Sequence, residues 1–198
     1  DSSEHFNLPN NPDKWPRSLH ARLTDRLVRS GAAVITFDIH FLEAKSQEDD
    51  LLFEGALREA GNVVLADALR AKEVPMGLVA EAHAVANSIV KISKPFAPFK
   101  AAAAGTAPFV LPRIPFKVNQ YWTFQEGAGD APTFPILALQ YFSSPVYSPF
   151  IQLLEQVRPS LSGQLPRDFE SARQTVGLEG LIRKIREQFE GDPLLAGD

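Results

Sequence analysis

The chain has 198 residues, 44% of them hydrophobic, which is enough for one domain with a substantial core. Its net charge of −4, with no block of like charge, argues against a general affinity for nucleic acid. The absence of cysteine excludes disulfides, thiolate metal sites and a cysteine nucleophile. No apolar run approaches the roughly 18 residues of a membrane span. Because the chain starts at Asp1 rather than at methionine, we expect it to be a fragment or a processed product.

The first part of the chain indicates an α/β core. After an irregular lead-in over residues 1–14, residues 15–92 predict a βαβ-type unit. The nearly continuous apolar run 32–39 is typical of a strand buried on both faces, and we expect it to be the central strand. A second short strand is expected at 62–66, parallel to the first through a right-handed crossover. The predicted fold class is therefore α/β, with a largely parallel central sheet between two helical layers, a three-layer arrangement.

Helices are expected beside these strands at residues 17–30 and 51–60, from apolar side chains at helical spacing. Ser18 is a candidate cap for the first helix, and Gly31 is well placed to end it in the left-handed conformation. The acidic run Glu48-Asp49-Asp50 favours the start of the second helix by capping and by the helix dipole. The apolar positions expected on the buried faces are Leu19, Leu23, Leu27 and Val28 in the first helix, and Leu52, Ala56, Leu57 and Ala60 in the second.

The middle of the chain is less regular. Residues 68–73 could form a helix, and residues 85–92 could form a third strand. Residues 94–150 form an elaboration rich in proline and phenylalanine, and we expect irregular or edge structure there because proline cannot donate to a sheet ladder. Within it, residues 114–124 alternate between apolar and polar side chains, which predicts a half-buried strand.

The last part of the chain predicts helices. Thr133 and Ser148, each with a proline close behind, mark the expected starts of two of them. Residues 160–177 are polar, and we expect a loop. Residues 178–190 carry an apolar stripe at helical spacing, which predicts a terminal helix.

Asp38 is the first candidate for function, because it lies near the carboxyl end of a predicted strand, where open α/β sheets place their ligand crevices. His40, two residues on, would face the same side of the strand. Together with Glu43 the pair could bind a cation or transfer protons. The alternative is structural, with Asp38 accepting hydrogen bonds from a turn and His40 solvated, since no third ligand is visible.

Two other side chains could contact a ligand. Arg113, between two prolines, could hold an anion, or it could form a salt bridge within the domain. Trp122, with Tyr121 and Phe124, could line an aromatic pocket, or these rings could serve packing between strands.

The chain lacks the short motifs of several enzyme classes. No serine stands in a G-x-S-x-G elbow, no Walker loop is present, and Gly127 and Gly129 lack the third glycine of a dinucleotide loop. The four histidines show no metal-ligand spacing. We therefore predict no catalytic residue, no cofactor and no metal. A small metal-assisted hydrolase that uses Asp38 and His40 is the alternative.

Four segments stand in the order found in one known family. They are Trp15-Pro16-Arg17-Ser18, Gly31-Ala32-Ala33-Val34-Ile35-Thr36-Phe37-Asp38-Ile39-His40-Phe41, Glu48-Asp49-Asp50-Leu51-Leu52 and Ala60-Gly61-Asn62-Val63-Val64-Leu65-Ala66. Their order resembles the second type of cyclase/histidine-kinase-associated sensory extracellular (CHASE) domain. Beyond Lys94, residues 111–116 replace the acidic turn of the family. Residues 120–124 and 127–130 are similar to those of cyanobacterial-type cyclase receptors, so the chain looks like a divergent branch.

The resemblance implies that residues 1–198 form a single extracytoplasmic sensory domain on the periplasmic side of the plasma membrane. Membrane helices outside this chain would tether it to a cytoplasmic output, with an adenylate or guanylate cyclase as the leading expectation and a kinase or phosphatase as others. No catalytic or ligand residues transfer, because such domains are sensors whose ligands are largely undefined. The expected partner is an unknown small ligand or protein.

A homodimer is the expected route for the signal, since the output domains of cyclases work as pairs. The helices at 17–30 and 178–190 are candidates for the contact, and burial against their own sheet would explain their apolar stripes equally well. Family members often continue into another strand before the membrane, so we also expect part of the sheet to follow residue 198.

Overall fold

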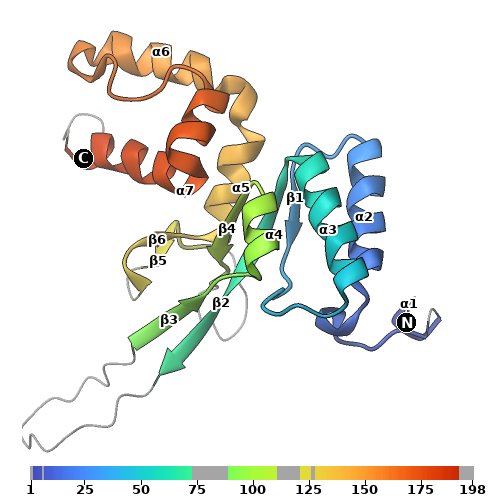
Figure 1. The fold of residues 1–198 in the computed structure, drawn as a ribbon. Coiled ribbons are helices and arrows are strands. Elements are labelled where there is room, and N and C mark those ends of the chain that lie inside the picture. Colours follow the sequence, from blue (N-terminus) through green and yellow to red (C-terminus); the bar gives the residue numbers. More distant parts are fainter. Residues whose placement is uncertain (1, 6, 73–88, 111–120, 126–127, 192–198) are drawn as a thin grey trace, which may run out of the picture.

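The structure is a computed structural model that describes residues 2–5, 7–72, 89–110, 121–125 and 128–191. A short helix α1 (Ser2–His5) and a 3-10 helix η1 (Pro12–Lys14) precede the core (Figure 1). Arg113, residues 85–88 and most of the strand expected at 114–124 lie outside the described residues. Within the described residues, no helix is long and apolar enough to cross a membrane.

The main sheet is built on β2 (Val63–Lys72), which changes partners halfway along its length. Its first half pairs in parallel with β1 (Ile35–Phe37) and β4 (Gly105–Pro108). Its second half pairs antiparallel with β3 (Ile89–Ser93), and the β2–β3 pair extends away from the helices in Figure 1. The α/β class is confirmed, and the sheet is small and mixed rather than largely parallel.

Three expectations about the strands differ from the structure. The central strand is β2, because β1 pairs with β2 alone among the described strands. In β1, Thr36 is exposed between two buried neighbours, so the strand is not covered on both faces. Residues 68–72 are strand rather than helix, since pairing with β3 outweighs the helical propensity of the alanines there.

One face of the sheet is covered by three helices: α2 (Arg17–Arg29), α3 (Gln47–Ala60) and α4 (Ala97–Ala102). Val63 and Leu65 of β2 point into this side and meet a group of phenylalanines. Their rings pack edge to face or tilted, with centroids 4.9 to 6.2 Å apart, a favourable geometry for aromatic pairs. The group consists of Phe37, Phe41, Phe53 and Phe99.

The other face is covered by α5 (Phe134–Phe142) and α7 (Phe169–Glu190), which meet Val64 and Ala66 of β2. Two residues in succession on β2 therefore serve opposite sides of the sheet, as the alternation of side chains in a strand requires. A further cluster of buried hydrophobic side chains joins α7 to α6 (Tyr147–Val157).

Short elements complete the described chain. They are a two-stranded sheet of β5 (Phe124–Gln125) and β6 (Ala131–Pro132), and the 3-10 helices η3 (Ser144–Val146) and η4 (Pro159–Leu161). Pro108 lies in β4, which pairs with β2 alone among the described strands, so this proline of the predicted elaboration does occupy an edge strand.

Helix α7 starts earlier than the apolar pattern predicts. The side chain of Asp168 accepts a hydrogen bond from the backbone nitrogen of Ser171 at 2.8 Å, so it caps a helix that begins inside the expected loop. Gly177, with φ 69° and ψ 170°, interrupts the helix just before the predicted start at residue 178. The second half of α7 is the predicted terminal helix, and its first half was missed.

The buried face of α2 also differs from the prediction. Arg17, His20 and Thr24 are buried, whereas Leu23 is 42% exposed and Val28 is 39% exposed. Leu52 of α3 is likewise 53% exposed. Ser18 does not cap α2, because Pro16 is the capping residue and makes no side-chain bond. The spacing of apolar residues predicted the wrong buried face because Arg17 and His20 are the side chains that pack against the phenylalanine group. The pattern counts both of these residues as polar.

Candidate functional site

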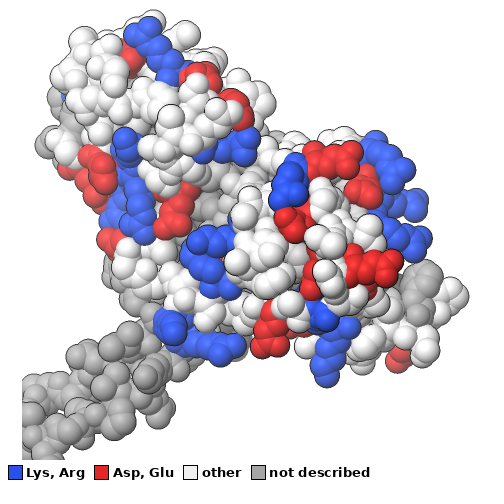
Figure 2. Space-filling model, viewed as in Figure 1, with Lys and Arg blue, Asp and Glu red and all other residues white. Residues whose placement is uncertain are grey.

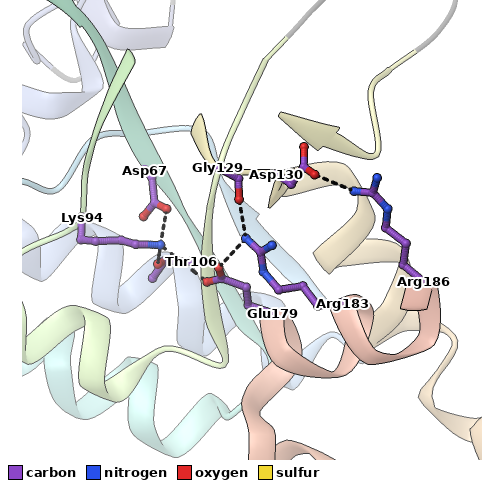
Figure 3. Close-up of polar contacts among 8 residues, drawn as sticks. All are labelled: Asp67, Lys94, Thr106, Gly129, Asp130, Glu179, Arg183 and Arg186. Carbon is purple, nitrogen blue, oxygen red and sulfur yellow. Dashed lines mark hydrogen bonds and ion pairs between the residues drawn. The ribbon is translucent and has the colours of Figure 1, made fainter. Parts of the chain in front are cut away.

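Asp67 is the most deeply buried carboxylate of the molecule's described part, and it lies where β2 changes partners. Its side chain has no exposed surface, and its Oδ2 accepts a hydrogen bond from Lys94 Nζ at 2.8 Å. Lys94 Nζ also lies 3.5 Å from the hydroxyl of Thr106 (Figure 3). Burial raises the pKa of the Asp67 carboxyl, and the bond from Lys94 opposes that rise.

Strand register brings these three residues together. Ala68 lies opposite Ser93, so Lys94 leaves β3 beside Asp67. Thr106 lies opposite Leu65 on β4. The arrangement therefore depends on three separate strands, and no local sequence motif could reveal it.

Helix α7 adds three charged side chains on one face, at intervals of four and three residues. Glu179 Oε2 lies 3.8 Å from Lys94 Nζ, and Glu179 Oε1 lies 3.5 Å from Arg183. Arg183 donates to the carbonyl of Gly129 at 3.2 Å, and Arg186 lies 3.6 Å from Asp130. We call this set the charge ladder: Asp67, Lys94, Glu179, Arg183, Arg186 and Asp130 (Figure 3). It connects the main sheet to α7 and to the turn before β6.

A shallow cleft of about 310 Å³ lies beside the ladder. Lys94, Lys100, Thr106 and Glu179 supply its polar lining, and Leu137, Val176 and Leu178 supply its apolar lining. Gly105 lets Leu137 and Leu178 pack closely against β4, since a Cβ there would lie 3.1 Å from Leu137 Cδ2 and 3.3 Å from Leu178 Cδ1. In the surface view of Figure 2, blue and red side chains intermingle over α7. The cleft can accept a small polar ligand, and its two lysines favour an anion.

A second polar cluster is buried under α2. The guanidinium of Arg17 stacks 4.5 Å from the centre of the Phe41 ring and lies 3.9 Å from Asp50. Arg17 is 2% exposed, its Nε and Nη1 make no hydrogen bond among the described residues, and burial lowers its pKa. Lys45 N donates to Asp50 Oδ2 at 2.8 Å.

His20 completes this cluster and is 1% exposed. Its Nδ1 lies 3.2 Å from the carbonyl of Pro16, to which it can only donate, and its Nε2 has no partner among the described residues. Burial, reinforced by the charge of Arg17, lowers the pKa of His20 to about 4. The cluster holds α2 and α3 against the phenylalanine group, which is a structural role.

The side chains predicted from the sequence lie elsewhere. Asp38 and His40 follow β1 and are exposed to solvent, and Glu43 is exposed as well. Across the described ranges, no group of three histidine, aspartate or glutamate side chains could hold a metal ion. Trp122 is 44% exposed beside a shallow hollow shared with Tyr121 and Phe124. The ligand-binding roles of Asp38, His40 and Trp122 stay predictions, and Arg113 lies outside the described residues.

Sequence reasoning missed Asp67, Lys94, Thr106 and Glu179. One signal was present, because Asp67 is a charged residue directly after the apolar run 62–66, as Asp38 is in the first strand. Lys94 and Glu179 carry no such signal, since lysine and glutamate are common on surfaces.

The model of the CHASE2 domain matches residues 3–177 of the chain. That match covers most of the sequence. CHASE2 domains are extracellular sensory domains of signalling receptors. The chain belongs to the CHASE2 domain family. Searches of the curated proteins and of the solved structures each gave no match.

Proposed function

We propose that this domain is the periplasmic input module of a membrane-bound receptor and passes a ligand or partner signal to a cytoplasmic output, a nucleotide cyclase. The family match over residues 3–177 carries the proposal. The cyclase output is supported by the resemblance of residues 120–124 and 127–130 to cyclase receptors.

The charge ladder supports a sensory role for α7. Ion pairs and a hydrogen bond from Glu179, Arg183 and Arg186 tie the second half of this helix to the sheet and to residues 129–130. A ligand that changes these contacts would favour one position of the helix over another. A sensor works in this way, because a ligand shifts an equilibrium only as far as its affinities for two states differ.

We also propose that this domain itself does no chemistry. In its favour, Asp38 and His40 are both exposed to solvent, and the described residues hold no three-ligand metal cluster. A catalytic pair would need a shielded site in which water is excluded and charge is stabilised.

A homodimer through α5 and α6 is the form that we propose for the receptor. Residues 131–154 contain no charged side chain, yet Leu139, Phe142, Val146 and Leu153 are 48 to 61% exposed. Two copies of such a face bring no like charges together, and it lacks the cations that would hold an anionic lipid surface. By contrast, the outer face of α2 carries arginines at 22, 26 and 29, visible as blue at the right of Figure 2, which would repel in a symmetric contact.

Ligand screening of the 198-residue chain tests the sensory role. Thermal unfolding midpoints should rise with a small molecule or ion that binds the folded state, by linkage. The full receptor, reconstituted with its membrane helices, should then change its cyclase output with the same compound. Turnover of a substrate by the isolated chain, without any ligand that stabilises it, would contradict the proposal.

A further inference from the structure

We propose that the cleft beside the charge ladder binds a small carboxylate with a short aliphatic tail, and that this ligand competes with Glu179 for Lys94. The inference rests on the sensory function proposed above and specifies the chemical class of its ligand. It begins with the unequal bonding of Lys94. Its Nζ holds Asp67 at 2.8 Å, whereas Glu179 is 3.8 Å away, beyond hydrogen-bond distance. One donor of the ammonium is therefore poorly used.

That poorly used donor borders the cleft, which Lys94 and Glu179 both line. A carboxylate entering there could take a direct hydrogen bond from Lys94, and charge-assisted bonds of this kind are about twice as strong as neutral ones. Lys100 supplies a second cation. It is exposed on α4, lines the same cleft and has no salt bridge within the described part of the chain.

The remaining lining of the cleft selects the group attached to the carboxylate. Val176, which is half-buried, presents apolar surface next to the two lysines, and Leu137 and Leu178, 0% and 2% exposed, form the packed floor beneath. A free inorganic anion would leave the apolar surface of Val176 unused, whereas a short aliphatic tail would remove it from water. The volume of about 310 Å³ is at the small end of ligand pockets, so the tail must be short.

The competition would loosen the start of the second half of α7. Glu179 is the second residue after Gly177, whose backbone conformation breaks the helix. When the ligand displaces Glu179 from Lys94, this half of α7 loses its ion pair to the sheet next to the break, while Leu181 and Ile182 stay buried in the core. Arg183 and Arg186 lie on the same half and contact Gly129 and Asp130, so the displacement reaches residues far from the cleft.

Binding of butyrate to the 198-residue chain tests the proposal, measured by amide chemical-shift changes or calorimetry, with butyramide and inorganic phosphate as matched probes. We expect butyrate to bind at least about tenfold more tightly than either. The Lys100→Gln variant should weaken butyrate about tenfold, whereas Lys14→Gln, in η1, should leave it unchanged. The Glu179→Gln variant should tighten butyrate about threefold, because the competing carboxylate is gone.

Glu179→Gln removes a nearby negative charge as well as the competitor, so tighter butyrate binding supports the proposal only together with the preference for butyrate over phosphate and the loss in Lys100→Gln. Equal binding of butyramide, stronger binding of phosphate, or an unchanged affinity in Glu179→Gln would each overturn the proposal. A receptor that responds to some other compound while butyrate fails to bind would overturn the ligand class and leave the sensory function intact.

Discussion

The ammonium of Lys94 lies 2.8 Å from the carboxylate of Asp67, whose side chain is completely shielded from solvent. Lys94 itself keeps 34% of its side chain exposed, so the two partners would not suffer equally from losing each other. Removing the lysine leaves a buried carboxylate without its charge partner. Removing the carboxylate leaves a lysine that water can still reach.

The Lys94→Met variant should therefore lose about 2 kcal/mol of unfolding free energy at pH 7, less than the roughly 3–5 kcal/mol of a fully buried pair because Lys94 is partly solvated. Burial already raises the pKa of Asp67, so its carboxyl group binds a proton more readily in the folded chain than in the unfolded chain. The loss should shrink as the pH falls and Asp67 becomes neutral. Urea unfolding at several pH values measures this, and Asp67→Asn combined with Lys94→Met should recover most of the loss. A loss that does not vary with pH would rule out the buried charge of Asp67 as its cause.

Gly177 should resist substitution. Its φ of 69° and ψ of 170° lie in a region that is almost restricted to glycine, so Gly177→Ala should cost about 1–3 kcal/mol. Gly55, inside α3, provides the control because a Cβ there meets no atom within 4 Å. Gly55→Ala should stabilise the chain by about 0.5–1 kcal/mol. Thermal or denaturant unfolding measures the stability of both variants. Equal changes in stability would show that the backbone at Gly177 does not require glycine.

His20 should make the fold sensitive to acid. Its pKa in the folded chain is about 4, below the ordinary value of 6.5, so the folded state excludes a proton that the unfolded chain binds. The stabilisation is complete above pH 6.5 and is lost as pH falls from 6.5 to 4, by an amount on the order of 3 kcal/mol.

The His20→Phe variant removes the titrating group and keeps ring contacts with Phe37, Phe41 and Phe53. The difference in stability between about pH 7 and about pH 4.5 should be smaller in this variant than in the parent chain. Chemical unfolding at both pH values provides the comparison, and identical pH dependence would remove His20 as the cause.

The proposed homodimer gives a further expectation. Phe142, 61% exposed on α5, should lie in the contact, so Phe142→Glu should shift the chain to a monomer. Val28→Glu places the same charge on exposed α2 and should leave the dimer intact. Light scattering after size exclusion reports both masses. A dimer that survives Phe142→Glu and dissociates in Val28→Glu would place the contact on α2 instead.

The parts of the fold that sequence could predict depend on local signals. Gly31 and Gly61 have φ values of 82° and 65°, and each ends a helix as expected. The parallel pairing of β1 with β2 is explained by two apolar runs separated by a helix. The acidic first turn of α3 is likewise confirmed, although the side chain of Ser46 supplies the cap.

The parts that could not be predicted depend on distant contacts. The strand at 68–72 exists because β3, which is distant in sequence, pairs with it. Asp67 and Glu179 are linked through Lys94 only in the folded chain. Arg17 is buried because a phenylalanine ring and Asp50 receive its guanidinium, and no periodicity marks an arginine as part of a core.

The change of partners along β2 has a consequence for local motion. Residues Val64 and Leu65 are held on both edges, by β1 and by β4, whereas residues from Ala68 to Lys72 pair with β3 alone among the described strands. Opening of the outer half breaks fewer bonds and exposes less apolar surface than opening of the inner half. Deuterium should therefore enter the amides of one half of this single strand well before those of the other, with Asp67 at the boundary.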